Sequence, residues 1–198
     1  MQDELIKLLA GRRGHFRMES GYHSELWFDL GRLFDDRVRL RPFVAELARR
    51  IAAHRIDAVC GPMTGGAKLA ELIAAELGIG CFVTERFEAA DAQGLFPVRY
   101  ELPAAQREAA RGRRFAVVDD AISAGSAVRG TYSDLVACGG VPVVCGALII
   151  FGDAIDRFAG EKSLIVESVA RMKFGIWQPA ECPLCRAGIA CERVSDTA

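Results

Sequence analysis

Val-Val-Asp-Asp-Ala-Ile-Ser-Ala-Gly-Ser, at residues 117–126, joins an apolar run to the start of a helical pattern. Residues 115–119 are typical of a buried strand that ends in two adjacent carboxylates, and residues 126–138 have the spacing of a helix. Ligands in open α/β sheets bind outside the carboxyl ends of the strands. We therefore interpret the turn between this strand and this helix as a binding site.

The residue types in this turn suit a phosphorylated sugar. The first turn of a helix offers unpaired backbone N–H groups and a partial positive charge, both of which attract a phosphate. Gly125 allows the backbone to approach closely, and Ser123 and Ser126 add hydroxyl donors. The carboxylates of Asp119 and Asp120 would repel a phosphate but accept hydrogen bonds from sugar hydroxyls. The simpler alternative is that Asp120 or Ser123 only caps the helix, which would explain one acid and one serine but not the whole pattern.

Strands and helices alternate along the rest of the chain. The patterns predict strands at 57–60, 80–84, 115–119, 141–151 and 163–169, and helices at 3–9, 41–54, 65–77 and 126–138. Continuous apolar strands that alternate with helices indicate an α/β fold with a central parallel sheet flanked by helices. Residues 15–29 alternate and contain a Ser-Gly pair, which predicts an extended hairpin.

Two segments break this alternation. Residues 86–114 combine charges, glycine and prolines with weak periodicity, and we expect them to form a long functional loop or lid. The chain from residue 177 onward contains prolines and three cysteines, and we expect an appendage rather than a domain.

Composition narrows the class of protein. A chain of 198 residues is long enough for one domain with a sizeable core. The formal net charge of -1 gives no reason to expect nucleic-acid or membrane binding. No apolar run reaches transmembrane length and no signal peptide is evident, so we expect a soluble cytoplasmic protein whose seven cysteines are reduced.

The segment 117–127 resembles the phosphoribosyl-diphosphate signature of type I phosphoribosyltransferases. Its Ser-Ala-Gly-Ser-Ala form is similar to that of orotate phosphoribosyltransferases. The resemblance implies that Asp119 and Asp120 hold the 2- and 3-hydroxyls of the ribose, and through the substrate a Mg²⁺ ion. It implies that the loop holding the 5-phosphate includes Ser123, Ala124, Gly125, Ser126 and Ala127.

The same resemblance implies an activity and an organisation. The expected reaction is Mg²⁺-dependent transfer of the 5-phosphoribosyl group from phosphoribosyl diphosphate to a nucleobase, with release of diphosphate. The expected protein is a homodimer in which each chain is a single phosphoribosyltransferase domain at 1–198. That domain would comprise a hood at about 1–38, a core at about 39–170 and a cysteine-containing tail at about 171–198.

A second strand-to-helix junction lies at 60–67, with the sequence Cys-Gly-Pro-Met-Thr-Gly-Gly-Ala. Two glycines at the start of a helix favour close approach of the backbone to an anion. The family places its diphosphate-binding loop at this point, which assigns Thr64, Gly65 and Gly66 to that loop. Orotate enzymes usually carry a lysine at the position of Gly65. Lys68, one turn further on, either substitutes for it or is an exposed helix residue.

Residues 19–29 resemble the Ser-Gly-x-x-Ser-x-x-aromatic-aromatic-Asp run that forms the hood over the base in the orotate family. This assigns Ser20, Trp27 and Phe28 to the base site, with Trp27 or Phe28 as the stacking platform. The alternative is that both rings are core residues, and the alternation of the segment favours a core position for one of them. The family usually has a lysine where this chain has Glu19. A carboxylate there would repel orotate, which is an anion.

The expected chemistry needs positive charge, because negative charge grows on the leaving diphosphate. Mg²⁺ and cationic side chains are therefore expected to clamp it. In the orotate family the catalytic loop begins with Arg-Lys and carries a lysine and a histidine, whereas residues 86–114 contain neither lysine nor histidine. Arg86 matches the family's arginine before the loop. We assign Arg86 to the leaving diphosphate, and the catalytic set is then Asp119, Asp120 and Arg86.

Cys182 and Cys185, followed by Cys191, have a spacing in which the first two thiolates can bind one metal ion. We consider a structural Zn²⁺ site with Cys191 as a third ligand and a fourth from elsewhere in the chain or from another subunit. The alternative is a reduced, exposed tail.

Three functions remain open on the sequence alone. The first is an orotate-type phosphoribosyltransferase. The second is a phosphoribosyltransferase for a different, less acidic heterocycle, favoured by Glu19 and by the absent lysines. The third is a non-catalytic regulator that binds phosphoribosyl diphosphate, because the sugar motif is retained while the catalytic cations are not.

Overall fold

The computed structural model describes residues 1–88 and 98–194. The helices are α1 (Gln2–Leu8), α2 (Arg37–Ala52), α3 (Gly65–Leu77), α4 (Ala104–Ala110), α5 (Ser126–Ala137), α6 (Ala154–Lys162) and α7 (Pro183–Arg186), with 3-10 turns η1 (Gly31–Phe34) and η2 (Pro179–Glu181). The strands are β1 (Ala10–Arg17), β2 (His23–Asp29), β3 (Ala58–Pro62), β4 (Gly80–Glu88), β5 (Val98–Glu101), β6 (Arg114–Ile122), β7 (Val141–Phe151), β8 (Ile165–Met172), β9 (Ile176–Trp177) and β10 (Glu192–Arg193). None of the helices in the described part of the chain is long and apolar enough to cross a membrane.

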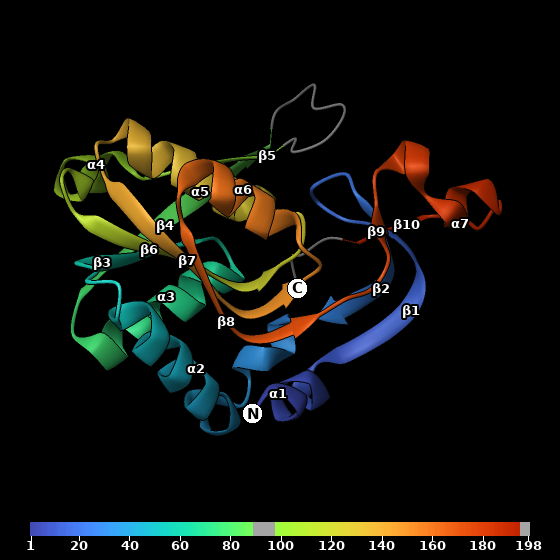
Figure 1. The fold of residues 1–198 in the computed structure, drawn as a ribbon, viewed down its shortest axis with the longest axis horizontal. Helices are drawn as coiled ribbons and strands as arrows, with labels where there is room; N and C mark the ends of the chain where they lie inside the picture. The colour runs from blue at the N-terminus through green and yellow to red at the C-terminus, as the bar shows by residue number, and fades with distance from the viewer. Residues whose placement is uncertain (89–97, 195–198) are drawn as a thin grey trace.

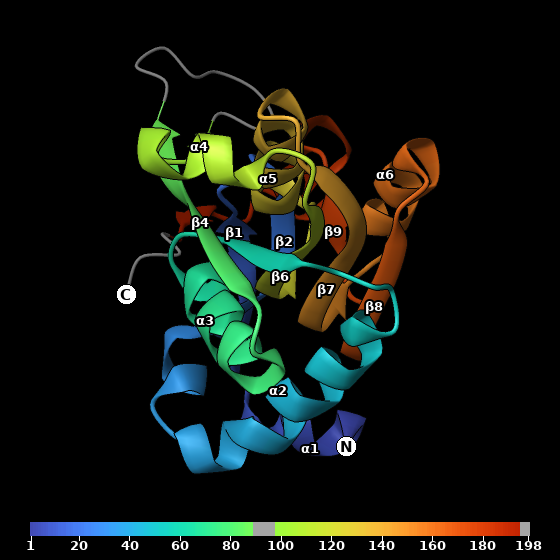
Figure 2. The same cartoon turned by 90° about the vertical axis from the view of Figure 1, so that its left-hand side faces the viewer.

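A six-stranded sheet forms the centre of the molecule, in the order β5-β4-β3-β6-β7-β8. Its strands pair in parallel except for β5, which runs antiparallel to β4 at one edge. Figures 1 and 2 show α2 and α3 on one face and α4, α5 and α6 on the other. The predicted α/β fold with a central parallel sheet is confirmed.

Alternation along the strands divides the interior into two cores. In β6, Ala116 and Val118 pack with α2 and α3, while Phe115 and Val117 pack with α5 and α6. Successive strand side chains point to opposite faces, so a strand covered on both sides must be apolar throughout. The run before the acid pair is continuously apolar because both faces of β6 are covered.

A second, four-stranded sheet has the order β10-β1-β2-β9, and we call it the hood sheet. Its centre is the antiparallel hairpin β1–β2, which confirms the hairpin predicted for 15–29. At the turn, the N–H of Gly21 donates to the carbonyl of Met18, and Gly21 has a φ of 83°, which favours glycine.

The end of the chain belongs to the hood sheet. Strand β9 pairs antiparallel with β2, and β10 pairs parallel with β1. Figure 1 shows the red tail beside the blue hairpin. The segment from residue 177, expected as an appendage rather than a domain, thus joins the hood through two strands that are too short to give a recognisable pattern in a sequence.

The expectation of one long loop at 86–114 is wrong for the described part of that segment. Strand β4 continues to Glu88, and β5 and α4 follow before β6 begins at Arg114. In β5, Val98 and Tyr100 are buried while Arg99 is exposed, an alternation too short to recognise alone. Residues 89–97 of the predicted lid lie outside the described residues.

Candidate functional site

A pocket of about 540 Å³ opens between the hood sheet and the carboxyl ends of the central strands. Its walls are residues 18–20 and 26–31 of the hood, 62–65 at the β3–α3 junction, 85–87 in β4 and 119–127 at the β6–α5 junction, together with Phe34, Lys68, Tyr100, Phe151 and Phe174. The pocket thus brings the two predicted phosphate loops and the predicted base residues together.

The acid pair lies on the pocket wall within β6. The Asp119 carboxylate accepts a hydrogen bond from the backbone N–H of Asp120 at 3.1 Å, and the Asp120 carboxylate accepts one from the N–H of Ala121 at 2.8 Å. Burial raises the pKa of Asp120, while these backbone donors and the positive charge of Lys68 act in the opposite direction. Both carboxyl groups are thus oriented by the backbone, as acceptors for hydroxyl groups need to be.

The helix-capping alternative for this motif does not hold. The residue that caps α5 is Gly125, which lies in the left-handed region with a φ of 79° and has no side chain to make a cap hydrogen bond. Arg129 instead holds the loop, because its guanidinium donates to the carbonyls of Ala124 at 3.3 Å and Ala154 at 3.1 Å. Asp120 and Ser123 therefore have no capping role that would account for them.

The β3–α3 junction lies directly against the acid pair. A Cβ atom at Gly65 would lie 2.1 Å from Oδ2 of Asp120, and one at Gly66 would lie 2.8 Å from Oδ1 of Asp119. The two predicted loops thus form one continuous surface. A side chain at position 65 would require the Asp120 carboxylate to shift.

Lys68 is exposed on the first turns of α3 and lines the pocket. Its ammonium group lies 5.5 Å from the centre of the Phe34 ring, and its charge acts on Asp120. Lys68 is thus a cation of the pocket wall rather than an isolated surface residue.

Glu19 lies in an ion pair that the sequence did not predict. Its carboxylate accepts hydrogen bonds from Nε of Arg86 at 2.8 Å and from the hydroxyl of Tyr100 at 2.7 Å. Burial and the neighbouring Glu19 raise the pKa of Tyr100, so its hydroxyl stays protonated and donates. The contact joins the hood to β4 and β5 and places a guanidinium charge beside the carboxylate. Repulsion of an anionic base by Glu19 is therefore reduced.

The predicted base residues line the pocket in different surroundings. Phe28 stacks on Phe151, with ring centroids 5.0 Å apart and planes inclined by 7°, and Phe174 packs against both rings. Trp27 lies under the guanidinium of Arg12, 5.3 Å from the ring centroid. Phe28 is thus the ring that also packs on the core, and its neighbours Phe151 and Phe174 were not predicted from the sequence.

Ser20 is buried at the hood turn and also lines the pocket. Its hydroxyl oxygen accepts a hydrogen bond from the N–H of Tyr22 at 3.4 Å. This contact fixes the turn that carries both Glu19 and Ser20 into the pocket.

The cysteine pair of the tail lies outside this pocket. Cys182 and Cys185 group with His15 and His23 of the hood hairpin. Cys191 is not part of this group, although the sequence suggested it as the third ligand. The histidines were missed because they are far from the cysteines in the sequence.

Solved structures share this architecture. The orotate phosphoribosyltransferase of Aeropyrum pernix matches with a TM-score of 0.65 and 21% identity, over 87% of this chain and 94% of that one. The adenine phosphoribosyltransferase of Thermoanaerobacter pseudethanolicus matches with a TM-score of 0.69 and 15% identity, over 87% of this chain and 100% of that one. The fold, with its hood and paired loops, is that of the phosphoribosyltransferases.

Sequence relatives narrow this class. No family model matches the chain. The orotate phosphoribosyltransferase of a Thermoanaerobacter species is 30% identical over 185 residues, which is 92% of this chain and 89% of the relative. That of Caldanaerobacter subterraneus is 29% identical over the same coverage. The chain belongs to the orotate phosphoribosyltransferase family.

Proposed function

We propose that this protein transfers the 5-phosphoribosyl group from phosphoribosyl diphosphate to orotate, with release of diphosphate. The observation that carries the proposal is the contact between the two loops, in which Gly65 and Gly66 lie against the carboxylates of Asp119 and Asp120. A sugar bound by the acids would have its anomeric carbon next to the start of α3. The diphosphate leaves from that carbon.

Within this arrangement each group of residues has one task. Asp119 and Asp120 accept hydrogen bonds from the ribose 2- and 3-hydroxyls, and the loop 121–127 receives the 5-phosphate at the start of α5. Thr64, Gly65 and Gly66 offer their backbone to the diphosphate. Lys68 and Arg86, which both line the pocket, oppose the negative charge that grows on the leaving group.

The residues of the pocket fit a Mg²⁺ ion. Carboxylate and phosphate oxygens are the ligands that this cation prefers. Asp119 and Asp120 lie beside the diphosphate loop and would act on the ion through the bound sugar, whose diphosphate would supply the phosphate oxygens. When bound, the ion would neutralise charge on the diphosphate. The side chains of Phe28, Phe151 and Phe174 form an apolar wall, which limits access of water to the activated sugar.

A second acceptor is supported by one specific observation. Glu19 and Tyr100 both line the pocket, and a carboxylate is a good acceptor for an N–H group on a neutral base. A less acidic heterocycle than orotate would donate a hydrogen bond to this carboxylate. Orotate is an anion, so its binding would depend on the positive charge of Arg86 to offset the negative charge of Glu19.

An assay of diphosphate release separates these acceptors. The protein is incubated with phosphoribosyl diphosphate, Mg²⁺ and one base at a time. Turnover with orotate supports the first acceptor, and turnover only with another base supports the second. Binding of phosphoribosyl diphosphate without turnover on any base would overturn both.

The sugar site is tested by binding. The double variant Asp119→Asn with Asp120→Asn is expected to lose affinity for phosphoribosyl diphosphate in calorimetry. Asp153→Asn, a change at an exposed aspartate outside the pocket, is the matched control and should bind normally. Unchanged affinity in the double variant would refute the assignment.

A further inference from the structure

Four side chains that commonly ligate metals converge where the tail meets the hood sheet. His15 comes from β1 and His23 from the start of β2, while Cys182 and Cys185 come from the start of the short helix α7 and from within it. Their ligand atoms all lie within 4.8 Å of one another. None of the four lines the sugar pocket.

We propose that these residues form a structural Zn²⁺ site with two nitrogen and two sulfur ligands. The ligands are Nε2 of His15, Nδ1 of His23 and the thiolates of Cys182 and Cys185. The set contains no carboxylate, and nitrogen with sulfur at four positions is the combination that zinc prefers over the hard cation of the catalytic pocket.

The distances between the ligand atoms agree with a tetrahedral site. Zinc bonds of about 2.3 Å to sulfur and about 2.0–2.1 Å to nitrogen place sulfur and nitrogen about 3.6 Å apart. The sulfur of Cys185 lies 3.7 Å from Nε2 of His15 and 3.3 Å from Nδ1 of His23, and the sulfur of Cys182 lies 3.5 Å from Nε2 of His15. The two imidazole nitrogens are 2.9 Å apart, so they need to separate by only about 0.4 Å to reach a tetrahedral spacing.

The orientation of His15 is fixed from outside the cluster. Nδ1 of His15 lies 2.8 Å from the carbonyl oxygen of Ile189, which can only accept a hydrogen bond. Nδ1 must therefore carry the proton, and the lone pair of Nε2 points toward His23 and the cysteines. A metal-bound histidine usually has this second hydrogen bond, which sets its tautomer and its ring orientation.

Burial favours a metal over four independent polar groups. His15 is 3% exposed, His23 is 7% exposed and Cys182 is fully buried. One ion would satisfy all four ligands at once, and Cys185 is the one exposed residue among the four. The alternative is a metal-free cluster that is held by hydrogen bonds or closed by a Cys182–Cys185 disulfide.

The position of the cluster indicates what the metal does. His15 and His23 flank the hairpin turn that carries Glu19 and Ser20 into the pocket. The tail also joins the hood through the two-residue strands β9 and β10 and through the ion pair of Arg12 with Glu192. A zinc ion would fix the tail to the hairpin and so hold the base-side wall in place.

Metal content of the purified full-length protein tests the site. Mass spectrometry for elements, after dialysis against metal-free buffer, is expected to find zinc at a one-to-one ratio with the chain. Cys182→Ser and Cys185→Ser should lose most of it, whereas Cys191→Ser and Cys81→Ser, at exposed cysteines outside the cluster, should retain it. Absence of zinc from the wild-type protein, even after reconstitution with zinc, would overturn the proposal.

Two further results would also overturn it. Loss of zinc from Cys191→Ser equal to the loss from Cys182→Ser would show that the ligand set is wrong. A mass lower by two hydrogens in the peptide that contains Cys182 and Cys185 would show a disulfide in place of a metal.

Cobalt substitution keeps the test independent of variants that fail to fold. The wild-type protein reconstituted with Co²⁺ should show intense visible bands of a tetrahedral ion and a thiolate-to-cobalt charge-transfer band. Weak bands typical of an octahedral ion would contradict the assignment. Hydrogen exchange supplies the structural readout: removal of the metal should increase exchange in residues 178–194 and 15–23 but leave β6 and β7 unchanged.

Discussion

At the scale of single residues, the geometry of the site depends on where side chains are absent as well as on where they are present. Gly65 gives the Asp120 carboxylate its space, and Glu19 takes up part of the charge of Arg86. The acid pair and the two glycines were predicted as parts of the candidate site because each lies in a short, continuous motif. It could not identify the Glu19–Arg86 contact, since those residues are 67 positions apart.

Gly65→Lys restores the residue that is usual in the family and tests this space. We expect weaker binding of phosphoribosyl diphosphate and a stability lower by about 1–3 kcal/mol, because the new Cβ would lie on the Asp120 carboxylate. Calorimetric affinity and urea unfolding measure both effects. Gly160→Ala, where an added Cβ meets open space within α6, is the control: it should leave binding unchanged and raise stability by about 0.5–1 kcal/mol, because alanine is favoured over glycine within a helix. Tighter binding in Gly65→Lys would contradict the explanation.

Glu19→Gln tests the charge next to the base. Two like charges about 4 Å apart repel each other by about 1 kcal/mol in water-like surroundings. Removal of one of them should therefore strengthen the binding of an anion about fivefold. We therefore expect the KM for orotate to fall about fivefold, with little change for a neutral base. Tyr100→Phe removes the neighbouring hydrogen bond but no charge, so it should not reproduce the selectivity. An equal effect on both bases would contradict an electrostatic origin.

At the scale of helices and strands, segments with a clear apolar period were predictable and segments with a weak one were not. The helix at 65–77 was predicted with the bounds that the structure has, because its apolar spacing extends over several turns. Strand β5 and helix α4 were taken for a loop, since they lie in a segment whose charges, glycine and prolines leave only weak periodicity. Helix α6 was missed for a similar reason.

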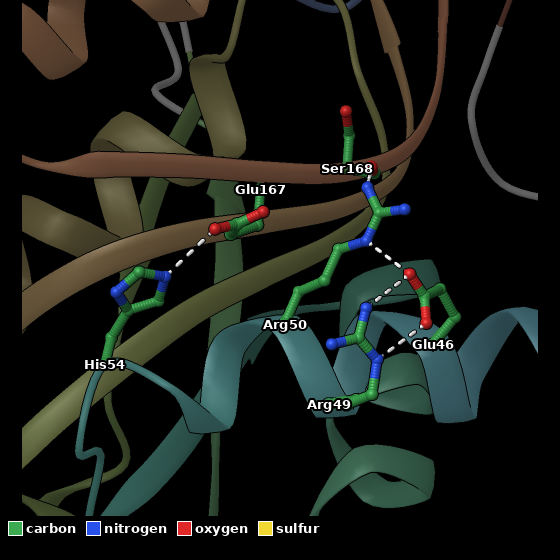
Figure 3. A network of polar contacts seen from close by, with 6 residues as sticks. All are labelled: Glu46, Arg49, Arg50, His54, Glu167 and Ser168. Atoms are coloured by element: carbon green, nitrogen blue, oxygen red, sulfur yellow. Dashed lines mark hydrogen bonds and ion pairs between the residues drawn. The ribbon is translucent and has the colours of Figure 1, made fainter.

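The contact between α2 and β8 makes a prediction about pH. Figure 3 shows Glu46 paired with Arg49 and Arg50, while Arg50 also donates to the carbonyl of Ser168 and His54 contacts Glu167. The hydrogen bonds from Arg49 and Arg50 lower the pKa of Glu46 to about 2. Because the pKa of Glu46 in the folded state lies below the usual value of 4.5, the contact of ionised Glu46 with the two arginines stabilises the protein above about pH 4.5. Its contribution is lost as the pH falls toward 2.

Glu46→Gln should therefore lower stability at pH 7 and flatten its dependence on pH between about 4.5 and 2. Urea unfolding midpoints at several pH values measure this, with Glu76→Gln, at an exposed position of α3, as the control. Parallel pH profiles for the wild type and Glu46→Gln would show that the pair has no effect.

At the scale of the whole molecule, the hood and the core meet through aromatic rings. Phe28 belongs to the hood, Phe151 ends β7 and Phe174 follows β8, yet their rings pack together on the pocket wall. The sequence predicted a donor site from local motifs, but this junction depends on tertiary packing between distant segments and no local pattern indicates it.

A double-mutant cycle tests that junction. Phe151→Ala should cost about 3–5 kcal/mol in urea unfolding, because its ring is almost fully buried. In combination with Phe28→Ala, we expect a coupling energy of about 0.5–1.5 kcal/mol from the stacked pair. Phe158→Ala, which lies in the other core, should combine with Phe28→Ala additively. Additivity for Phe28 and Phe151 would mean that the hood and core are independent.

The parallel pairing of β10 with β1 has a consequence for synthesis on the ribosome. Strand β1 emerges early, but its partner at 192–193 is made only after the whole central sheet. Domains begin to fold as they are synthesised, and contacts between distant residues form late. The nascent chain is thus expected to have a formed sugar site while the hood still exposes an unpaired strand edge. Contact with another nascent chain is then a greater hazard for the hood than for the core.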